Sequence, residues 1–287
     1  GGGGVYYHLS YWGRPHDYMW LTTTQPGLIY SEMKAAYDHN CRKLWIVNVH
    51  DPKVAAYDLE FFLDMAWDIN SIQPNTINQH LERWLCTQFG ENAGKQLAPA
   101  MREFYRLCGI RKPEFMGWSQ VELDKKYYPR GRSQVVDTEF SEKEFGNELN
   151  RYLLDYAAIC QTVNKVEKAI RPELKDAFFA HIKYPVLASN AMATKMLYAQ
   201  KARSKYLGQT DKTMEGREDY MKAAAATSIR AYREIQDLTN KYNALGDGKW
   251  NGIMNMMPRE LPVFNPPTIP YLPEDLDLKL PLHKACT

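Results

Sequence analysis

Long hydrophobic runs and a large net charge are both lacking in this sequence. No apolar stretch among its 287 residues approaches the roughly 18 residues that a membrane-spanning helix needs. The 36 basic and 34 acidic residues leave a formal net charge of +2, which gives no general argument for nucleic-acid binding. We therefore expect a soluble globular chain with neither membrane nor nucleic acid as a partner.

Paired cysteines and closely spaced metal ligands are lacking as well. The 5 cysteines include no Cys-x-x-Cys pair, so neither a zinc site nor a disulfide framework is indicated. His8, His16 and His50 do not have the paired helical spacing of zinc ligands. We predict no metal and no cofactor. A Ser10, His50 and Asp51 triad is a weak candidate, because no Gly-x-Ser-x-Gly turn presents the serine.

Strands and helices alternate in the first 70 residues. Residues 4–9 and 43–49 have the apolar pattern of strands, whereas 27–38 and 54–67 predict helices. This alternation favours parallel α/β units, whose ligands bind at the carboxyl ends of the strands. Because a strand of this kind normally has earlier strands beside it, we expect the chain to be a fragment of a longer protein.

The region after Pro74 is predicted to be all-α. Long helical segments are expected at 75–89, 91–108, 141–170, 172–207 and 214–245. The clearest evidence is one apolar stripe whose spacing alternates between four and three residues: Phe145, Leu149, Tyr152, Tyr156, Ile159, Val163, Val166 and Ile170. Pro185 predicts a kink or break. Residues 109–140 are expected to form an irregular connection, and the proline-rich residues 258–281 an extended tail.

Aromatic, imidazole and acidic groups crowd the first predicted strand and the loop after it. They are Tyr6, Tyr7, His8, Tyr11, Trp12, His16, Asp17 and Trp20. Aromatic rings pack on the C–H faces of sugars, and phenol, imidazole and carboxylate groups bond sugar hydroxyls. The sequence therefore predicts a saccharide cleft. The alternative is that the strand aromatics Tyr6 and Tyr7 fill the core.

A second polar cluster, residues 48–52, follows the second predicted strand. Asn48 stands where the strand ends and is expected to point its amide into the cleft mouth. Asp51, just before Pro52, has a simpler alternative role as a turn or helix-capping residue.

Basic residues also gather in the predicted helix 172–207: Lys183, Lys195, Lys201, Arg203 and Lys205. A phosphate-binding face is one interpretation. The favoured one is ordinary charge complementarity towards the C-terminus of a helix.

Two runs carry a specific resemblance: Tyr-Tyr-His-Leu-Ser-Tyr-Trp-Gly at 6–13 and Leu-Trp-Ile-Val-Asn-Val-His-Asp-Pro at 44–52. With residues 60–67 and 248–259 they resemble glycoside hydrolase family 115, the xylan α-glucuronidases. The resemblance implies an enzyme that removes 4-O-methylglucuronic acid, α-1,2-linked to xylose, with inversion and without a metal. Its substrate would be glucuronoxylan or an aldouronic acid.

The resemblance also implies an α/β part followed by an all-α part. Residues 1–70 would be the last two strand–helix units of a TIM-like (β/α)8 barrel, and residues 71–248 a multi-helix bundle domain. Residues 249–287 would be a proline-rich tail leading to a β-sandwich. A polymeric substrate implies a secreted enzyme, and a homodimer through the helical domain is a further expectation.

Residue roles follow from the same resemblance. Tyr11 and Asn48 look like the family's active-site tyrosine and asparagine, and they are the expected catalytic residues. His8, Arg14 and Asp51 flank them and are the expected substrate-binding residues, since a guanidinium pairs well with a glucuronate carboxylate. His50 departs from the pattern, because a glycine is expected at that position of the family's Asn-Val-Gly-Asp turn.

Inversion needs one carboxyl group as acid and another as base, roughly 6.5 to 9.5 Å apart. The resemblance places the family's principal acids on earlier barrel strands, so these 287 residues alone are expected to be inactive. The alternative is a non-catalytic module for helical dimerisation or carbohydrate binding, in which the aromatic cluster is only core.

Overall fold

The computed structural model describes residues 2–11, 19–117, 137–207, 217–255, 258, 261–267 and 269. Among these residues, no helix combines the length and the apolarity needed to cross a membrane. Cys41, Cys86, Cys108 and Cys160 are free thiols.

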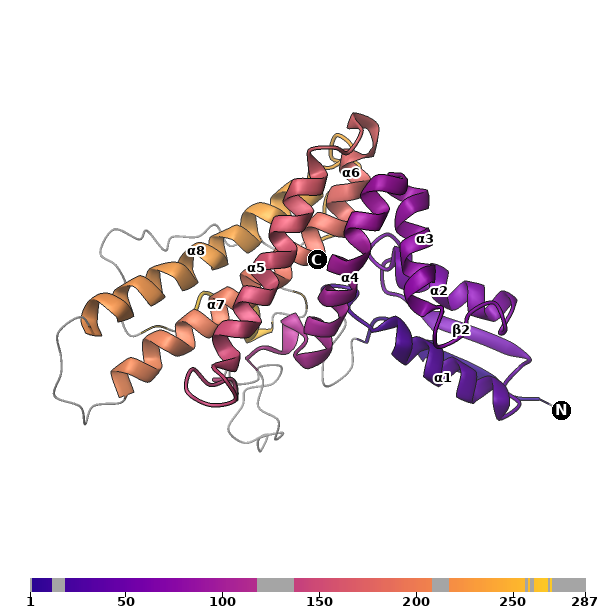
Figure 1. Ribbon diagram of the computed structural model, residues 1–287, viewed down its shortest axis with the longest axis horizontal. Coiled ribbons are helices and arrows are strands. Elements are labelled where there is room, and N and C mark those ends of the chain that lie inside the picture. The colour runs from indigo at the N-terminus through magenta and orange to yellow at the C-terminus, as the bar shows by residue number, and fades with distance from the viewer. Residues whose placement is uncertain are drawn as a thin grey trace.

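In the described part of the chain, two parallel strands form a sheet. β1 (Gly4–His8) pairs with β2 (Leu44–Asn48), and the register places His8 opposite Asn48. α1 (Pro26–Asp38) connects the strands, and α2 (Ala56–Trp67) follows β2. Figure 1 shows these elements at one end of the molecule, with the long helices α5, α7 and α8 at the other. The predicted strand–helix alternation and the parallel pairing are confirmed.

Among the residues that the structure describes, those packed against the sheet cover one of its faces. Tyr7 and Trp45 pack against the core on that face, and the Tyr7 ring stacks on Phe62 with 6.1 Å between ring centroids. On the opposite face, which we call the open face, Tyr6 is 56% exposed and Ile46 is 45% exposed. Two strands do not make a barrel, so that part of the expected fold stays a prediction.

The remaining long helices are α3 (Ile77–Phe89), α4 (Glu91–Ile110), α5 (Glu148–Glu167), α7 (Tyr184–Leu207) and α8 (Arg217–Asn243). α3 and α4 are joined by Gly90, whose φ of 91° lies in the region that favours glycine. They approach closely at Gly94, where an added Cβ would meet the Cys86 backbone nitrogen at 2.4 Å. The chain therefore needs a glycine at this contact.

The start of α5 differs from the prediction. Phe145, Gly146 and Asn147 all have positive φ, at 48°, 66° and 56°, so none of them extends the helix. The Asn147 side chain instead accepts a hydrogen bond from Asn150 N and caps α5. Phe145 is 74% exposed and was wrongly included in the apolar stripe. The other predicted members, from Leu149 to Ile170, are buried as expected.

The predicted kink at Pro185 takes the form of a π-helical turn. The segment starts with a 3-10 turn (Pro172–Leu174) and α6 (Lys175–Phe178), and the π turn (Phe179–Lys183) leads directly into α7. Pro185 has no N–H to donate to the carbonyl four residues earlier, so the regular α-helical pattern is interrupted before it.

The first part of the proline-rich segment is buried, not extended along a surface. Pro262–Phe264 forms a 3-10 turn, and Val263 and Phe264 are each only 1% exposed. Lys195 of α7, itself buried, donates hydrogen bonds from Nζ to the carbonyls of Val263 and Asn265. The prediction of an extended tail is wrong for these residues, and most of the segment lies outside the described ones.

Other predicted basic residues are also held by partners from other elements. Lys183 Nζ lies 2.5 Å from Glu167 Oε2, and Lys201 bonds the Asn150 side chain. Arg203 pairs with Asp137. These contacts favour a structural role for the basic residues over a phosphate-binding face; the Lys205 side chain lies outside the described part.

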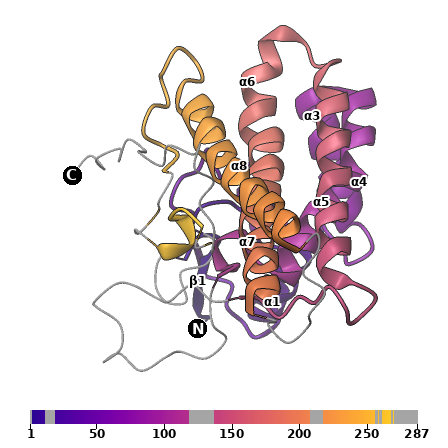
Figure 2. The same cartoon turned by 90° about the vertical axis from the view of Figure 1, so that its left-hand side faces the viewer.

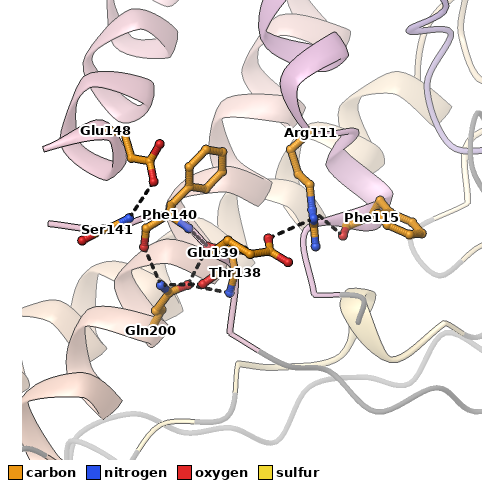
Figure 3. Close-up of polar contacts among 8 residues, drawn as sticks. All are labelled: Arg111, Phe115, Thr138, Glu139, Phe140, Ser141, Glu148 and Gln200. Atoms are coloured by element: carbon orange, nitrogen blue, oxygen red, sulfur yellow. Dashed lines mark hydrogen bonds and ion pairs between the residues drawn. The ribbon is translucent and has the colours of Figure 1, made fainter. Parts of the chain in front are cut away.

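The segment 137–141 is fixed between α7 and the end of α4, as Figure 3 shows. Gln200 Oε1 accepts from the Thr138 N and Oγ1 atoms at 2.8 Å each, and Gln200 Nε2 donates to the Phe140 carbonyl at 3.0 Å. Arg111 Nη1 lies 3.2 Å from Glu139 Oε2. One glutamine side chain thus bonds the backbone of this segment at both Thr138 and Phe140.

The loop after β1 docks on the helices through buried polar contacts. Glu114 Oε1 accepts from Met19 N at 3.0 Å, and Trp20 Nε1 donates to Tyr184 Oη at 3.2 Å. The Trp20 ring also meets Phe264 edge-on, 5.2 Å between centroids. Figure 2 shows β1 near one end of the helical bundle. Buried side chains of both regions therefore form one contiguous core.

We predict that Lys195→Ala lowers the free energy of unfolding by roughly 3 kcal/mol, because it leaves a cavity and removes the donor from the buried Val263 carbonyl and the part-buried Asn265 carbonyl. Urea denaturation measures the change. Lys34→Ala is the control: Lys34 forms an exposed i,i+4 pair with Asp38, so its loss should cost less than about 0.5 kcal/mol. Equal effects of the two substitutions would contradict the anchoring role of Lys195.

Candidate active site

The carboxyl ends of β1 and β2 are tied together by backbone hydrogen bonds. His8 lies opposite Asn48, and the Leu9 and Ser10 amides both donate to the Asn48 carbonyl, at 2.9 and 3.2 Å. The chain leaving β1 is thereby held over the end of β2. The side chains that follow both strands consequently share one site.

Aromatic and polar groups gather on the open face at this site. His8 lies between Tyr6 and Tyr11, with ring centroids 4.8 and 5.1 Å away and both contacts edge-to-face. Asn48 Nδ2 donates to Tyr6 Oη at 3.3 Å. The structure therefore brings the predicted residues His8, Tyr11 and Asn48 together. Tyr6, another member of the predicted aromatic cluster, contacts His8 and Asn48 and is not part of the core.

Asn48 and Asp51 shape the turn after β2. Asn48 Oδ1 accepts from His50 N at 3.3 Å, and Asp51 Oδ1 accepts from Lys53 N at 3.0 Å. The Asp51 carbonyl accepts from the Val54 and Ala55 amides, each at 3.1 Å, just before α2 begins. These contacts give Asp51 the turn-forming role that the sequence offered as the alternative to substrate binding.

His50 occupies a strained position in this turn. Its φ of 51° lies in the left-handed region, which glycine adopts without steric cost. The resemblance led us to expect a glycine here, and the backbone has the conformation that such a glycine would take. Burial lowers the pKa of the His50 imidazole, and the nearby Asp51 carboxylate opposes this shift.

A pair of lysines beside an indole was not predicted from the sequence. Lys53 Nζ lies 4.8 Å from the centroid of the Trp250 ring, and Lys249 Nζ lies at the same distance. Burial lowers the pKa of Lys53, and Lys249 adds to this, while Asp51 and Asp176 oppose it. Lys53 lies in the turn after β2, whereas Lys249 follows α8, and both offer ammonium donors suited to a carboxylate.

Other members of the predicted cluster do not join the site. Trp20 is only 3% exposed and belongs to the core, and Tyr7 faces the covered side of the sheet. Arg14, Trp12, His16 and Asp17 lie outside the described residues. Within the described part of the chain, no group of three or more His, Cys, Asp or Glu side chains could hold a metal ion.

The side chains at this site have the chemistry to bind and orient a polar ligand. Tyr6, His8, Tyr11 and Asn48 offer phenol, imidazole and amide groups, which donate to and accept from sugar hydroxyls. None of these four is a carboxylic acid, the group that glycoside hydrolysis uses for proton transfer.

Comparison with known proteins supports a carbohydrate-active class. Residues 1–115 match the model of Glycosyl hydrolase family 115. A solved structure, described as a novel family GH115 4-O-methyl-α-glucuronidase with specificity for decorated arabinogalactans, matches 97% of this chain at 41% identity and a TM-score of 0.79. The chain covers 34% of that protein, about a third of its length. A comparison with curated proteins gives no match.

These findings show that the chain is related to the glycoside hydrolases. More specifically, it contains a glycosyl hydrolase family 115 region, and the resemblance seen in the sequence is confirmed.

We predict that His50→Gly is more stable than His50→Ala by about 1 kcal/mol. Both variants lose the imidazole, but only alanine retains a Cβ in the left-handed conformation, which costs about 1 kcal/mol or more. Chemical denaturation of the two variants measures the difference. Equal stability would show that the turn does not hold residue 50 at positive φ in solution.

Proposed function

We propose that this chain is part of an inverting α-glucuronidase that removes (4-O-methyl)glucuronic acid from a polysaccharide, with α-1,2-linked residues on glucuronoxylan as the expected substrate. The observation that carries the proposal is the gathering of Tyr6, His8, Tyr11 and Asn48 on the open face at the carboxyl ends of parallel strands. The related 4-O-methyl-α-glucuronidase has specificity for decorated arabinogalactans. A glucuronic acid carried by a polysaccharide is thus the shared substrate class.

In this proposal β1 and β2 are the last two strands of a (β/α)8 barrel, and the open face is part of its interior. Support comes from their parallel pairing and from the packing of only one face against the core. Residues 71–248 would be the helical domain and 249–287 the start of the connection to a further domain.

Tyr11 and Asn48 would hold the sugar or orient the attacking water. His8 would bond a sugar hydroxyl, and its place between two tyrosine rings fixes its orientation. Arg14 would pair with the glucuronate carboxylate. Lys53 is a second candidate for this carboxylate, because it lies in the loop that follows Asn48.

The chemical step itself would rest on residues outside this chain. Inversion requires two carboxyl groups roughly 6.5 to 9.5 Å apart, one to protonate the leaving oxygen and one to activate water. We assign these to earlier strands of the barrel. A polymeric substrate would place the enzyme outside the cytoplasm, and the helical domain is where a homodimer would form.

We predict that Tyr11→Phe and Asn48→Ala, made in a full-length enzyme that contains this chain, each lower kcat/KM for aldouronic acids by about 100-fold, as expected for loss of a positioned hydrogen-bonding group. Tyr37→Phe is the matched control, since Tyr37 lies on α1 beneath the Arg42 guanidinium. Circular dichroism checks folding. Unchanged hydrolysis by folded Tyr11 and Asn48 variants would refute the assignment and favour a non-catalytic binding or dimerisation module.

We also predict that the purified 287-residue chain releases no glucuronic acid from aldouronic acids, because the described residues of the open face include no acid–base pair. Chromatographic detection of free glucuronic acid after long incubation is the measurement. The full-length enzyme is the positive control. Release by the chain alone would mean that its own carboxylates perform the reaction.

A further inference from the structure

A small cavity lies between the start of α2 and the helices packed against it. Its volume is about 30 Å³, and its lining includes residues from α2, α3, α4 and the π-helical turn. Most of these are apolar or aromatic. The polar ones on which the inference depends are Tyr57, Asp58, Tyr105 and His181.

Asp58 is the unusual member of this lining. It has no exposed surface, and it stands in the first turn of α2. Its Oδ1 accepts a hydrogen bond from the Tyr105 phenol at 3.3 Å. Its Oδ2 has no hydrogen-bond partner within the part of the chain that the structure describes. A buried carboxyl oxygen without a partner is destabilising, so an additional group at this place would be strongly favoured.

The cavity is large enough and polar enough to hold water, which can serve as the missing hydrogen-bond partner of Asp58 Oδ2. A water molecule needs roughly 10 to 15 Å³ of such space together with polar neighbours, so one or two molecules fit. We propose that the cavity is a hydration site, in which ordered water bonds to Asp58 Oδ2 and links α2 to α4 and to the π-helical turn.

The protonation of the lining supports this arrangement. Burial raises the pKa of Asp58 well above its ordinary value, although the Tyr105 hydrogen bond opposes the shift. This shift favours the protonated carboxyl, whose Oδ2 can donate to water. Burial and the charge of Lys53 lower the pKa of His181 to about 4, so its imidazole is neutral at neutral pH and has a nitrogen that accepts. Water between them would accept from Asp58 and donate to His181.

The neighbouring titratable groups do not compete for the proposed water. Tyr57 donates to or accepts from His80 Nδ1 at 3.3 Å, and His80 Nε2 lies 2.9 Å from Asp64 Oδ2, so these groups already have partners. Other titratable groups that interact with Asp58, Tyr57 or His181 are Tyr105, Cys108, Glu60, Arg83 and Lys53.

A pH dependence of stability follows from the raised pKa of Asp58. The folded chain keeps a proton here that the unfolded chain releases above the ordinary pKa of 3.8. The stability contributed by this group is therefore complete below that value and is lost as the pH rises towards the folded-state pKa.

The first experiment separates a hydrated cavity from a dry one. In a Tyr105→Phe background, which removes the phenol donor, Asp58→Asn is compared with Asp58→Leu in the 287-residue chain. Asparagine can still bond water, whereas leucine of similar size cannot. We expect the asparagine variant to have the higher Tm, by about 2 to 4 °C. A leucine variant of equal or higher Tm would show that the cavity is dry and would overturn the proposal.

The second experiment uses pH. The Tm advantage of Asp58→Asn over the unaltered chain should grow between about pH 4 and about pH 8, because the amide cannot ionise. Asp38→Asn, at an exposed position paired with Lys34, serves as the control and should show no comparable growth. A constant difference for Asp58→Asn would contradict a protonated Asp58.

Direct observation complements both experiments and needs no variant. A crystal structure of the unaltered chain at a resolution that shows ordered water should contain density within hydrogen-bonding distance of Asp58 Oδ2. An empty cavity in that structure would overturn the proposal.

Discussion

The parallel pairing of β1 with β2 is the constraint on which the rest of this structure depends. The register puts His8 against Asn48, and the Asn48 carbonyl then binds two amides of the chain leaving β1. Because side chains alternate between the faces of a strand, the same register sends Tyr7 into the core and Tyr6 and His8 to the open face. One set of backbone hydrogen bonds thus determines which side chains face the site and which face the core.

The helices contact the chain that leaves this strand pair. The loop after β1 carries Trp20 into the bundle, where its indole N–H bonds Tyr184, whose hydroxyl lies 3.1 Å from Thr239 Oγ1. Lys195 holds the 3-10 turn that places Phe264 against Trp20. The position of the strand ends is therefore maintained by residues far along the chain, and the open face is supported by the helical region behind it.

Local periodicity predicted much of this fold from the sequence. The strand–helix alternation and the α5 stripe from Leu149 onward were found, since both are repeated signals. Phe145 was misplaced because its spacing fits the stripe, while three successive positive φ values remove it from the helix. Burial of Val263 and Phe264 could not be found locally, because their partners, Lys195 on α7 and Trp20 after β1, are distant in the sequence. For the site, the alternation of side chains along β1 could not show whether Tyr6 or Tyr7 faces the core. That assignment depends on which face of the sheet the helices cover.

The π-helical turn before α7 has a consequence for the phase of the apolar pattern. A π turn holds about one residue more than an α-helical turn, so the residues before it are rotated by roughly 100° relative to a continuous helix. An apolar pattern with α-helical spacing in α6 therefore does not continue on the same face of α7. The two helices cannot be treated as one continuous α-helix. Deleting one residue within Phe179–Lys183 would restore the α-helical phase between α6 and α7.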